Sequence, residues 1–449
     1  MSDTTDMTEG NIRSTILKFY FPMLVTSMLQ QLYTVADIAI VGKGLGDDKL
    51  AAVGNMSSVT FLIFGFAMGL SNGFSVIVAQ EFGAKQQTRL RQSVAAAIRL
   101  AVVIAAVLTC LSLIFLPDIL RLMQTNPAII GDSLRYGYYI FGGLTITFSY
   151  NLCAGFLRAL GDSRTPLRAI IASSIVNLAL DSLLIFVFKT GVEGAAIATV
   201  FSQMVSTAIC LHRLRRIEDI HLTRVDFKTC APFYGILFGN GLPMALMNSI
   251  TAIGCVVVQY FVNGMGVAFT SAYSACSKYI NLFMQPGCTA GYTMSAFTSQ
   301  NYGARKYDRI RSGLTVCVMI CVIAYALLGS MMCFLPRQLA GIMLNGEDSL
   351  ALAAQFLPIS GALLIGVDLL FVFRSGVQGM GHPTAPMISG VMEMVMRISV
   401  IVIFTKLIGF RATAFAEASA WFGALAINLP AFFYYYCKAK KNGTETLSV

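Results

Sequence analysis

Two aspartates stand out because they lie in stretches that are otherwise almost entirely apolar. Asp37 lies in SMLQQLYTVADIAIVG, and Asp181 ends NLALD, four residues after Asn177. A charged side chain at the centre of a lipid bilayer costs about 2.5–3.5 kcal/mol, so each one is a candidate for function. Thr199, in GVEGAAIAT, adds a hydroxyl. Two carboxylates, an amide and a hydroxyl are oxygen ligands that suit a hard cation, and two close carboxylates can also hold a proton.

The neighbours of these aspartates leave one simpler interpretation open. Tyr33 and Thr34 lie about one turn before Asp37 and Gln30 about two turns before it, so all of them share one helix face. Asp181 is only about two turns from the end of its apolar run, and both aspartates would simply be hydrated if they lay near helix ends. The cost of burying a charge nevertheless favours a functional role for the group.

The second half of the chain carries a different set of charges in its apolar runs. They are Lys278, Asp368, Arg374, Glu393, Arg397 and Glu417. Glu393 and Arg397 are four residues apart, which predicts an ion pair along one helix face. Lys278 then needs an acidic partner, for which Asp368 and Glu393 are the candidates. This pattern favours a structural or gating network over a second substrate site.

The composition indicates which elements must position these side chains. Of the 449 residues, 56% are hydrophobic and 12% are charged, against about 25% charged in a soluble domain. So few polar residues exclude soluble, disordered and disulfide-scaffold proteins. The apolar runs are too long for barrel strands of about ten alternating residues, so we expect an all-α integral membrane protein. Twelve transmembrane helices are predicted, at 14–41, 51–80, 93–116, 133–157, 167–188, 193–212, 233–261, 267–299, 312–335, 350–373, 384–405 and 412–436.

The basic residues indicate the orientation of the chain in a membrane. Eighteen of the 32 Lys and Arg residues lie in the loops after expected helices 2, 4, 6 and 8 or in the tail after helix 12, and eight lie in the opposite loops. By the positive-inside rule, both termini are expected in the cytoplasm and the protein in the inner cell membrane. The net charge of +10 is therefore an orientation signal, and no nucleic-acid partner is expected.

The two halves of the sequence resemble each other. QEFGAK (80–85) matches QNYGAR (300–305), and GDSRTP (161–166) matches GHPTAP (381–386), both at an offset of 220, while Pro22 matches Pro243 at 221. Six expected helices separate the matches, which predicts two pseudo-symmetric six-helix lobes, 1–212 and 233–449, joined by a cytoplasmic linker, 213–232. Such a duplicated bundle suits alternating access about a central cavity.

Taken together, these motifs resemble the multidrug and toxic compound extrusion (MATE) family over essentially the whole chain. The resemblance rests on Asp37, GLGDDKLAAVG (44–54), QEFGAK with its echo QNYGAR, GFLRALGDSRTP (155–166), NLALD (177–181) and GVEGAAIATVFSQ (191–203). It implies two lobes that form a V, and the export of organic cations, drugs or amphipathic metabolites coupled to Na⁺ or H⁺. In prokaryotic members an Asp of helix 1, the Asn and Asp of helix 5 and a Thr of helix 6 form the cation site. They correspond to Asp37, Asn177, Asp181 and Thr199.

Within that family the chain is more similar to the DinF-like kind than to the NorM-like kind. The NorM-like branch places a Glu in helix 7, where this chain reads GLPMALMNSITAIGCVV (241–257) without an acid, although Asp368 can match that branch's helix 10 acid. We expect a small-molecule organic cation or amphipathic substrate, contact with membrane lipid, a monomer, and no cofactor beyond the coupling ion.

Two alternatives remain at this point. One is a flippase for a lipid-linked saccharide or another polar lipid, whose pyrophosphate would need basic residues such as Lys278, Arg374 and Arg397 around the cavity. The other is a membrane enzyme, which is not expected because the sequence has no HExxH, GxSxG or P-loop motif.

Overall fold

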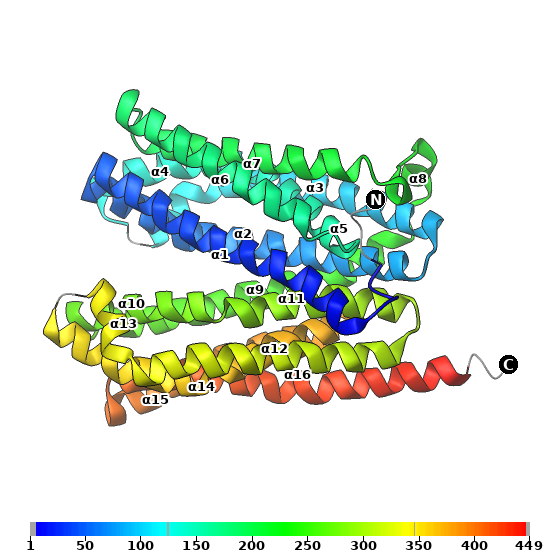
Figure 1. The fold of residues 1–449 in the computed structure, drawn as a ribbon. Helices are drawn as coiled ribbons and strands as arrows, with labels where there is room; N and C mark the ends of the chain where they lie inside the picture. The colour runs from blue at the N-terminus through cyan, green and yellow to red at the C-terminus, as the bar shows by residue number, and fades with distance from the viewer. Residues whose placement is uncertain (1–5, 124, 345, 446–449) are drawn as a thin grey trace. The chain divides into compact units, whose positions relative to one another are not determined.

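The computed structural model describes residues 6–123, 125–344 and 346–445, which are helical and contain no strand (Figure 1). The first half comprises α1 (Ile12–Leu45), α2 (Asp47–Gly83), α3 (Gln87–Leu122), α4 (Pro127–Gly142), α5 (Leu144–Ala159), α6 (Arg164–Ser182), the π-helical turn η1 (Leu183–Val187), α7 (Val192–Leu214), η2 (Glu218–Ile220) and α8 (Arg224–Thr229). The second comprises α9 (Phe233–Asn263), α10 (Val267–Phe283), α11 (Gln285–Gly303), α12 (Tyr307–Phe334), α13 (Pro336–Met343), α14 (Glu347–Gly379), α15 (Thr384–Ile408) and α16 (Arg411–Glu445).

All twelve ranges predicted as spans are helical. In the described part of the chain, nine helices are long and apolar enough to cross a membrane, or ten if α4 and α5, bent by 45° at their junction, form one span. The two remaining ranges are α10 with α11, and α16. The α11 helix is polar because it is an interior helix, with Thr289, Thr293, Ser299 and Asn301 all fully buried. A helix enclosed by protein does not need the hydropathy that lipid demands.

The chain divides into two compact units. One unit contains Phe21–Ala245, and the other contains Asp6–Tyr20 together with the chain from Leu246 onwards. The first turns of α1 therefore belong with the second half, and the first half of α9 belongs with the first. Both changes of unit occur within three residues of a helix-internal proline, Pro22 in α1 and Pro243 in α9. The predicted lobe limits, 1–212 and 233–449 with the linker between them, differ from this division and stay a prediction.

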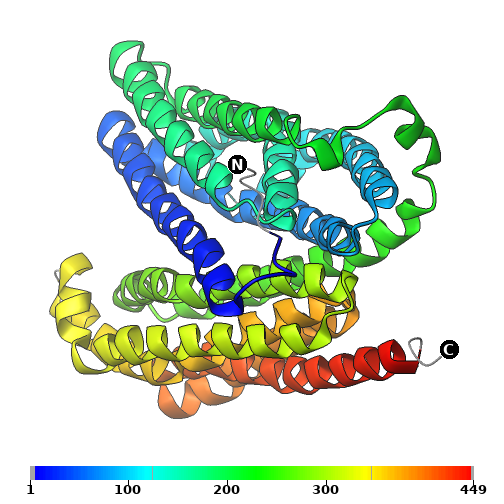
Figure 2. The same cartoon turned by 45° about the vertical axis from the view of Figure 1, so that its right-hand side comes forward.

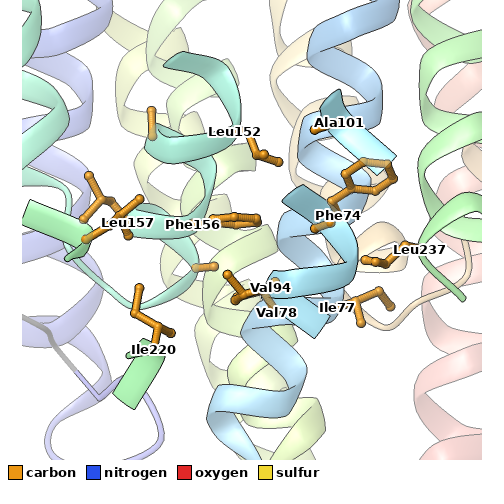
Figure 3. Close-up of a cluster of buried hydrophobic side chains, with 14 of the residues drawn as sticks. Phe74, Ile77, Val78, Val94, Ala101, Leu152, Phe156, Leu157, Ile220 and Leu237 are labelled. Atoms are coloured by element: carbon orange, nitrogen blue, oxygen red, sulfur yellow. The ribbon is translucent and has the colours of Figure 1, made fainter. Parts of the chain in front are cut away.

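Within the first unit, α2 and the start of α9 meet through small residues. A Cβ atom on Gly69 would lie 2.5 Å from the Cα atom of Ala245, and one on Gly73 would lie 2.5 Å from the Cα atom of Gly241. Small residues four apart on both helices allow this backbone approach, as in membrane helix pairs generally. Beside it lies a hydrophobic core from α2, α3, α5, η2 and α9, in which Phe74 and Phe156 are nearly fully buried (Figure 3).

In the second unit, α14 is the central helix. It packs against α11, α12 and α16, and the yellow to red helices α14, α15 and α16 run side by side in Figures 1 and 2. Its core includes Tyr273, Phe356 and Trp421. This packing buries the polar residues of α14 and α15 that are described below.

Candidate cation-binding site

Three helices of the first unit bring the candidate residues together: α1 carries Asp37, α6 carries Asn177 and Asp181, and α7 carries Thr199. Gly44, two turns after Asp37, fixes the register between α1 and the end of α6. A Cβ atom at Gly44 would lie only 2.3 Å from Cγ2 of Ile185 in η1, so the helices approach each other closely there. The close approach of α1 to η1 at Gly44 therefore holds Asp37 and Asp181 opposite each other.

The two carboxyl groups lie close enough to each other to interact electrostatically. The Asn177 amide links Asp181 to the other helices once its NH₂ group is oriented toward the acceptors around it. Nδ2 then donates to Oδ2 of Asp181 over 2.6 Å and to the Tyr33 hydroxyl over 3.2 Å, and Oδ1 accepts from the Thr199 backbone N–H over 3.2 Å. Asn177 and Asp181 have no solvent-exposed surface. All four predicted residues thus belong to one cluster, although their role remains a prediction.

The cluster contains two acceptor oxygen atoms that receive no hydrogen bond. Oδ1 of Asp37 and Oδ1 of Asp181 are both buried without a hydrogen-bond partner. A buried acceptor without a donor costs free energy, and two adjacent carboxylates repel strongly where the dielectric constant is low. One monovalent cation or one proton would relieve both penalties. The ligands are hard oxygen atoms, which fits Na⁺. In the part of the chain that the structure describes, no group of three or more His, Cys, Asp or Glu side chains is placed to hold a metal ion.

Two tyrosines complete the site, and only one had a sequence signal. Tyr33 lies one turn before Asp37 and contacts Asn177 and Thr199. Tyr136, on α4, lies close enough to Asp37 and Asp181 to interact electrostatically with both. Nothing in the run RYGYYIFGG distinguishes Tyr136 from the two tyrosines that follow it.

Two other residues of the predicted α1 face do not join the cluster. Gln30 and Thr34 are exposed, and the Thr34 hydroxyl donates to the Gln30 carbonyl over 2.9 Å. Of the residues predicted to share one face of α1, only Tyr33 and Asp37 therefore belong to the cluster.

The backbone of α6 changes its winding directly after Asp181. Leu183–Val187 forms a π-helical turn, a feature that occurs often at functional sites. Val41, Ile185 and Ala195 form a small apolar cluster around this turn. The turn brings Ile185 against Gly44 and places apolar side chains next to the carboxylates, which strengthens any electrostatic interaction there.

The charged residues of the second unit form a network, but not the predicted one. Arg374 on α14 is paired with Glu393 on α15. Arg397 donates to Oε2 of Glu417 on α16 over 2.9 Å, and the Tyr273 hydroxyl donates to Oε1 of Glu417 over 3.2 Å. The predicted ion pair between Glu393 and Arg397 is therefore wrong. Both side chains are buried, and each forms its ion pair with a different helix, Glu393 with α14 and Arg397 with α16. Ion pairs between packed helices are shielded from water, which strengthens the attraction between the charges.

Lys278 and Asp368 lie outside these pairs. Lys278 is exposed and forms no ion pair in the described part of the structure, so neither Asp368 nor Glu393 is its partner. Asp368 is buried, its Oδ1 atom has no hydrogen-bond partner, and a Cβ atom on Gly287 would lie 2.1 Å from that atom. The predicted four-residue network thus separates into an exposed lysine, a solitary carboxyl group and two buried ion pairs.

Comparison with known families agrees with this duplicated helical architecture. The MatE family model matches the chain twice, over residues 22–183 and 243–403, so that the matches begin at Pro22 and Pro243. The chain belongs to the MatE family, the multidrug and toxic compound extrusion transporters. The predicted family is confirmed, and the choice between the DinF-like and NorM-like kinds stays a prediction.

Individual relatives are distant but cover most of the chain. The Bacillus subtilis protein described as "probable multidrug resistance protein YoeA" is 29% identical over 350 residues, 76% of each chain. An FAD transporter of Shewanella oneidensis is 22% identical and covers 88% of each chain. A MATE transporter solved in a bent conformation has a TM-score of 0.89 at 21% identity, covering 98% of this chain and 100% of its own. That likeness confirms the predicted all-α membrane fold.

Proposed function

We propose that this MatE-family protein exports organic cations, drugs or amphipathic metabolites by cation-coupled alternating access. The observation that carries the proposal is the pair of carboxyl groups of Asp37 and Asp181, each with a buried oxygen atom that has no hydrogen-bond partner. The names of the bacterial relatives, which include multidrug resistance and multidrug export proteins, support the substrate class. We further propose that the chain acts as a monomer in the inner cell membrane, with both termini in the cytoplasm, and that it is not an enzyme.

In the proposed cycle, Asp37 and Asp181 take up one Na⁺ or H⁺ when the site is open to the outside. Asn177 orients the Asp181 carboxylate, and Tyr33 and Thr199 hold Asn177 in place. Cation uptake removes the repulsion between the carboxylates, so α1 and α6 can pack more closely. Coupling requires that the cation and the substrate favour opposite states of the transporter, because a ligand shifts an equilibrium only by its differential affinity.

The flippase alternative has less support. It needs unpaired basic side chains to meet a pyrophosphate, but Arg374 and Arg397 are each paired with a glutamate. Lys278 is exposed. A basic cluster committed to acidic partners is a poor receptor for another anion, since binding would first have to break a buried ion pair.

The test is transport in proteoliposomes. Efflux of a cationic dye is measured with an imposed Na⁺ gradient or an imposed pH gradient, for the wild type, Asp37→Asn and Asp181→Asn. Both variants are expected to fall to the level of empty liposomes, because an amide has no negative charge to attract Na⁺ and cannot take up and release H⁺. Asp118→Asn is the matched control, since Asp118 is an exposed acid of the same unit that pairs with Arg121 over 3.6 Å. Full gradient-driven efflux in both site variants would refute the proposal.

A further inference from the structure

The segment Asp6–Gly10 is docked on the corner between α11 and α12 (Figure 2). The Met7 side chain has no exposed surface. Its backbone N–H donates to Oε1 of Gln300 over 2.9 Å, and its carbonyl accepts from Asn301 over 3.2 Å and from Arg309 over 3.1 Å. A segment held by side chains at both its N–H and its C=O groups is a built part of the fold, and it carries the start of α1 with it.

Arg309 is the main donor to this segment. Besides Met7, it donates to the carbonyls of Glu9 and Gly10, over 3.0 Å each, while its Nε–H donates to Oδ1 of Asn301 over 3.1 Å. Lys306 adds a bond of 2.8 Å to the Thr8 carbonyl. These acceptors are uncharged oxygens, and the Asp6 and Glu9 carboxylates near Arg309 offset part of the positive charge at this corner.

A groove runs between the docked segment with the first turn of α1 and the side of α12. Its volume is about 550 Å³. Arg13, Arg309, Ser312 and Thr315 line it at the polar end of α12, and Val316 and Met319 line it one to two turns further along that helix. Arg13 is exposed and has no hydrogen-bond or ion-pair partner in the described part of the chain. Met319 is 51% exposed.

We propose that this groove binds an anionic phospholipid, with its phosphate at Arg13 and Arg309 and the start of its acyl chain along Val316 and Met319. Guanidinium groups match phosphate oxygens in geometry and charge. The sequence of α12 changes from YDRIRSG to LTVCVMICV within a few turns. The lining of the groove therefore changes from polar to apolar along α12, as a phospholipid changes from its head group to its acyl chains. Arg305 and Arg311 add positive charge nearby, and basic pockets between transmembrane helices are typical sites for anionic head groups.

Binding would have a structural consequence. The phosphate would bridge Arg13 on α1 and Arg309 on α12, and would therefore stabilise the docked position of the first turns of α1. Asp6 and Glu9 place negative charge close to Arg309. A lipid with a net negative charge is attracted to Arg13 and Arg309 strongly enough to overcome repulsion from Asp6 and Glu9. A zwitterionic lipid has a weaker net attraction to the two arginines, so we expect the groove to select anionic lipid.

The experiment measures lipid binding to the purified full-length protein in detergent, by native mass spectrometry and by thermal unfolding. Phosphatidylglycerol, phosphatidylcholine with the same acyl chains, and inorganic phosphate are titrated separately. Phosphatidylglycerol is expected to bind and to raise the Tm, while the other two leave it unchanged. Arg13→Gln is expected to weaken phosphatidylglycerol binding about tenfold, the effect of one lost charge-assisted contact, and Arg13→Lys to recover much of it.

Lys18→Gln is the matched control, because Lys18 is an exposed base on the same helix and does not line the groove. It is expected to bind phosphatidylglycerol as the wild type does. Equal binding by wild type and Arg13→Gln, or an equal Tm rise with phosphatidylcholine, would overturn the proposal. The same shift with inorganic phosphate alone would overturn the assignment to a lipid. The inference requires only a membrane-embedded chain, so dye efflux by Asp37→Asn and lipid binding by Arg13→Gln succeed or fail separately.

Discussion

Replacing Arg309 by Ala is expected to loosen the N-terminal segment while the rest of the protein stays folded. Arg309 makes four hydrogen bonds to the segment and its supports, and only those to Asn301 and Met7 are partly buried. A hydrogen bond from a charged donor contributes about 1.5–3 kcal/mol when shielded, and exposed ones contribute little. Counting the two shielded bonds at the lower end gives about 3 kcal/mol, which corresponds to roughly 150-fold more frequent opening of the segment.

Hydrogen–deuterium exchange is the assay, read on the peptide that covers residues 6–16. The wild-type amide of Met7 is protected by its bond to Gln300, and in the variant this peptide should exchange faster by the factor above. The segment should not detach fully, because Met7 remains a buried side chain that contributes about 2 kcal/mol. Peptides from α14 should be unchanged.

The internal repeat supplies the control for this experiment. Arg89 and Glu81 occupy the positions of Arg309 and Asn301 at the offset of 220, and Arg89 bonds to Glu81 over 3.0 Å as Arg309 bonds to Asn301. Arg89→Ala removes the equivalent guanidinium from the other unit and should leave exchange of residues 6–16 unaltered. An exchange rate within threefold of wild type in Arg309→Ala, or an equal acceleration in Arg89→Ala, would refute the reasoning.

Three further outcomes follow from the packing. Gly44→Ala should raise the Na⁺ or H⁺ concentration needed for half-maximal efflux, because a Cβ atom at that position would lie 2.3 Å from Ile185 in η1. Gly54→Ala is the control, since a Cβ atom there has no neighbour within 4 Å and should leave that concentration unchanged. Equal behaviour of the two variants would contradict the role of the contact between Gly44 and η1. Glu417→Gln should lower the free energy of unfolding by about 3 kcal/mol by leaving Arg397 buried without its counter-charge, and replacing both residues by Leu and Met should restore most of it in a denaturation assay. Burial and the charge of Lys438 lower the pKa of His382, so the unfolded state binds its proton more readily; wild-type Tm should therefore fall more than that of His382→Phe as the pH drops below about 6.5.

The sequence was sufficient to predict that Asp37, Asn177, Asp181 and Thr199 lie together, and their role as a cation site stays a prediction. Asn177 and Asp181 are one helical turn apart, so they lie on the same face of their helix. A carboxyl group in an apolar segment is expected to lie next to another polar group, which for Asp181 is Asp37. Tyr136 could not be predicted, because its role depends on where α4 lies relative to α1 and α6. No periodicity within α4 contains that information.

The ion pairs of the second unit also could not be predicted from the sequence. Helical spacing correctly places Glu393 and Arg397 on one helix a turn apart, but it does not show which neighbouring helix each one meets. Arg374 and Glu417 lie 19 and 20 residues away from their partners along the chain. When charges are buried, partner choice is decided by shielding between helices, and this is a property of tertiary packing.

The assignment of Asp6–Tyr20 to the second unit has a consequence for biosynthesis. The rest of that unit begins at Leu246, so about 225 residues must be added after Tyr20 before the unit begins to be made. At roughly 5–20 residues per second, synthesis from Met7 to Arg309 takes about 15–60 s, and the binding corner of Met7 does not exist during that time. The segment Asp6–Gly10 therefore makes its contacts with α11 and α12 long after it has been synthesised. A ribosome that stalls before α12 would leave the segment Asp6–Gly10 without the Arg309 and Lys306 side chains that bind it.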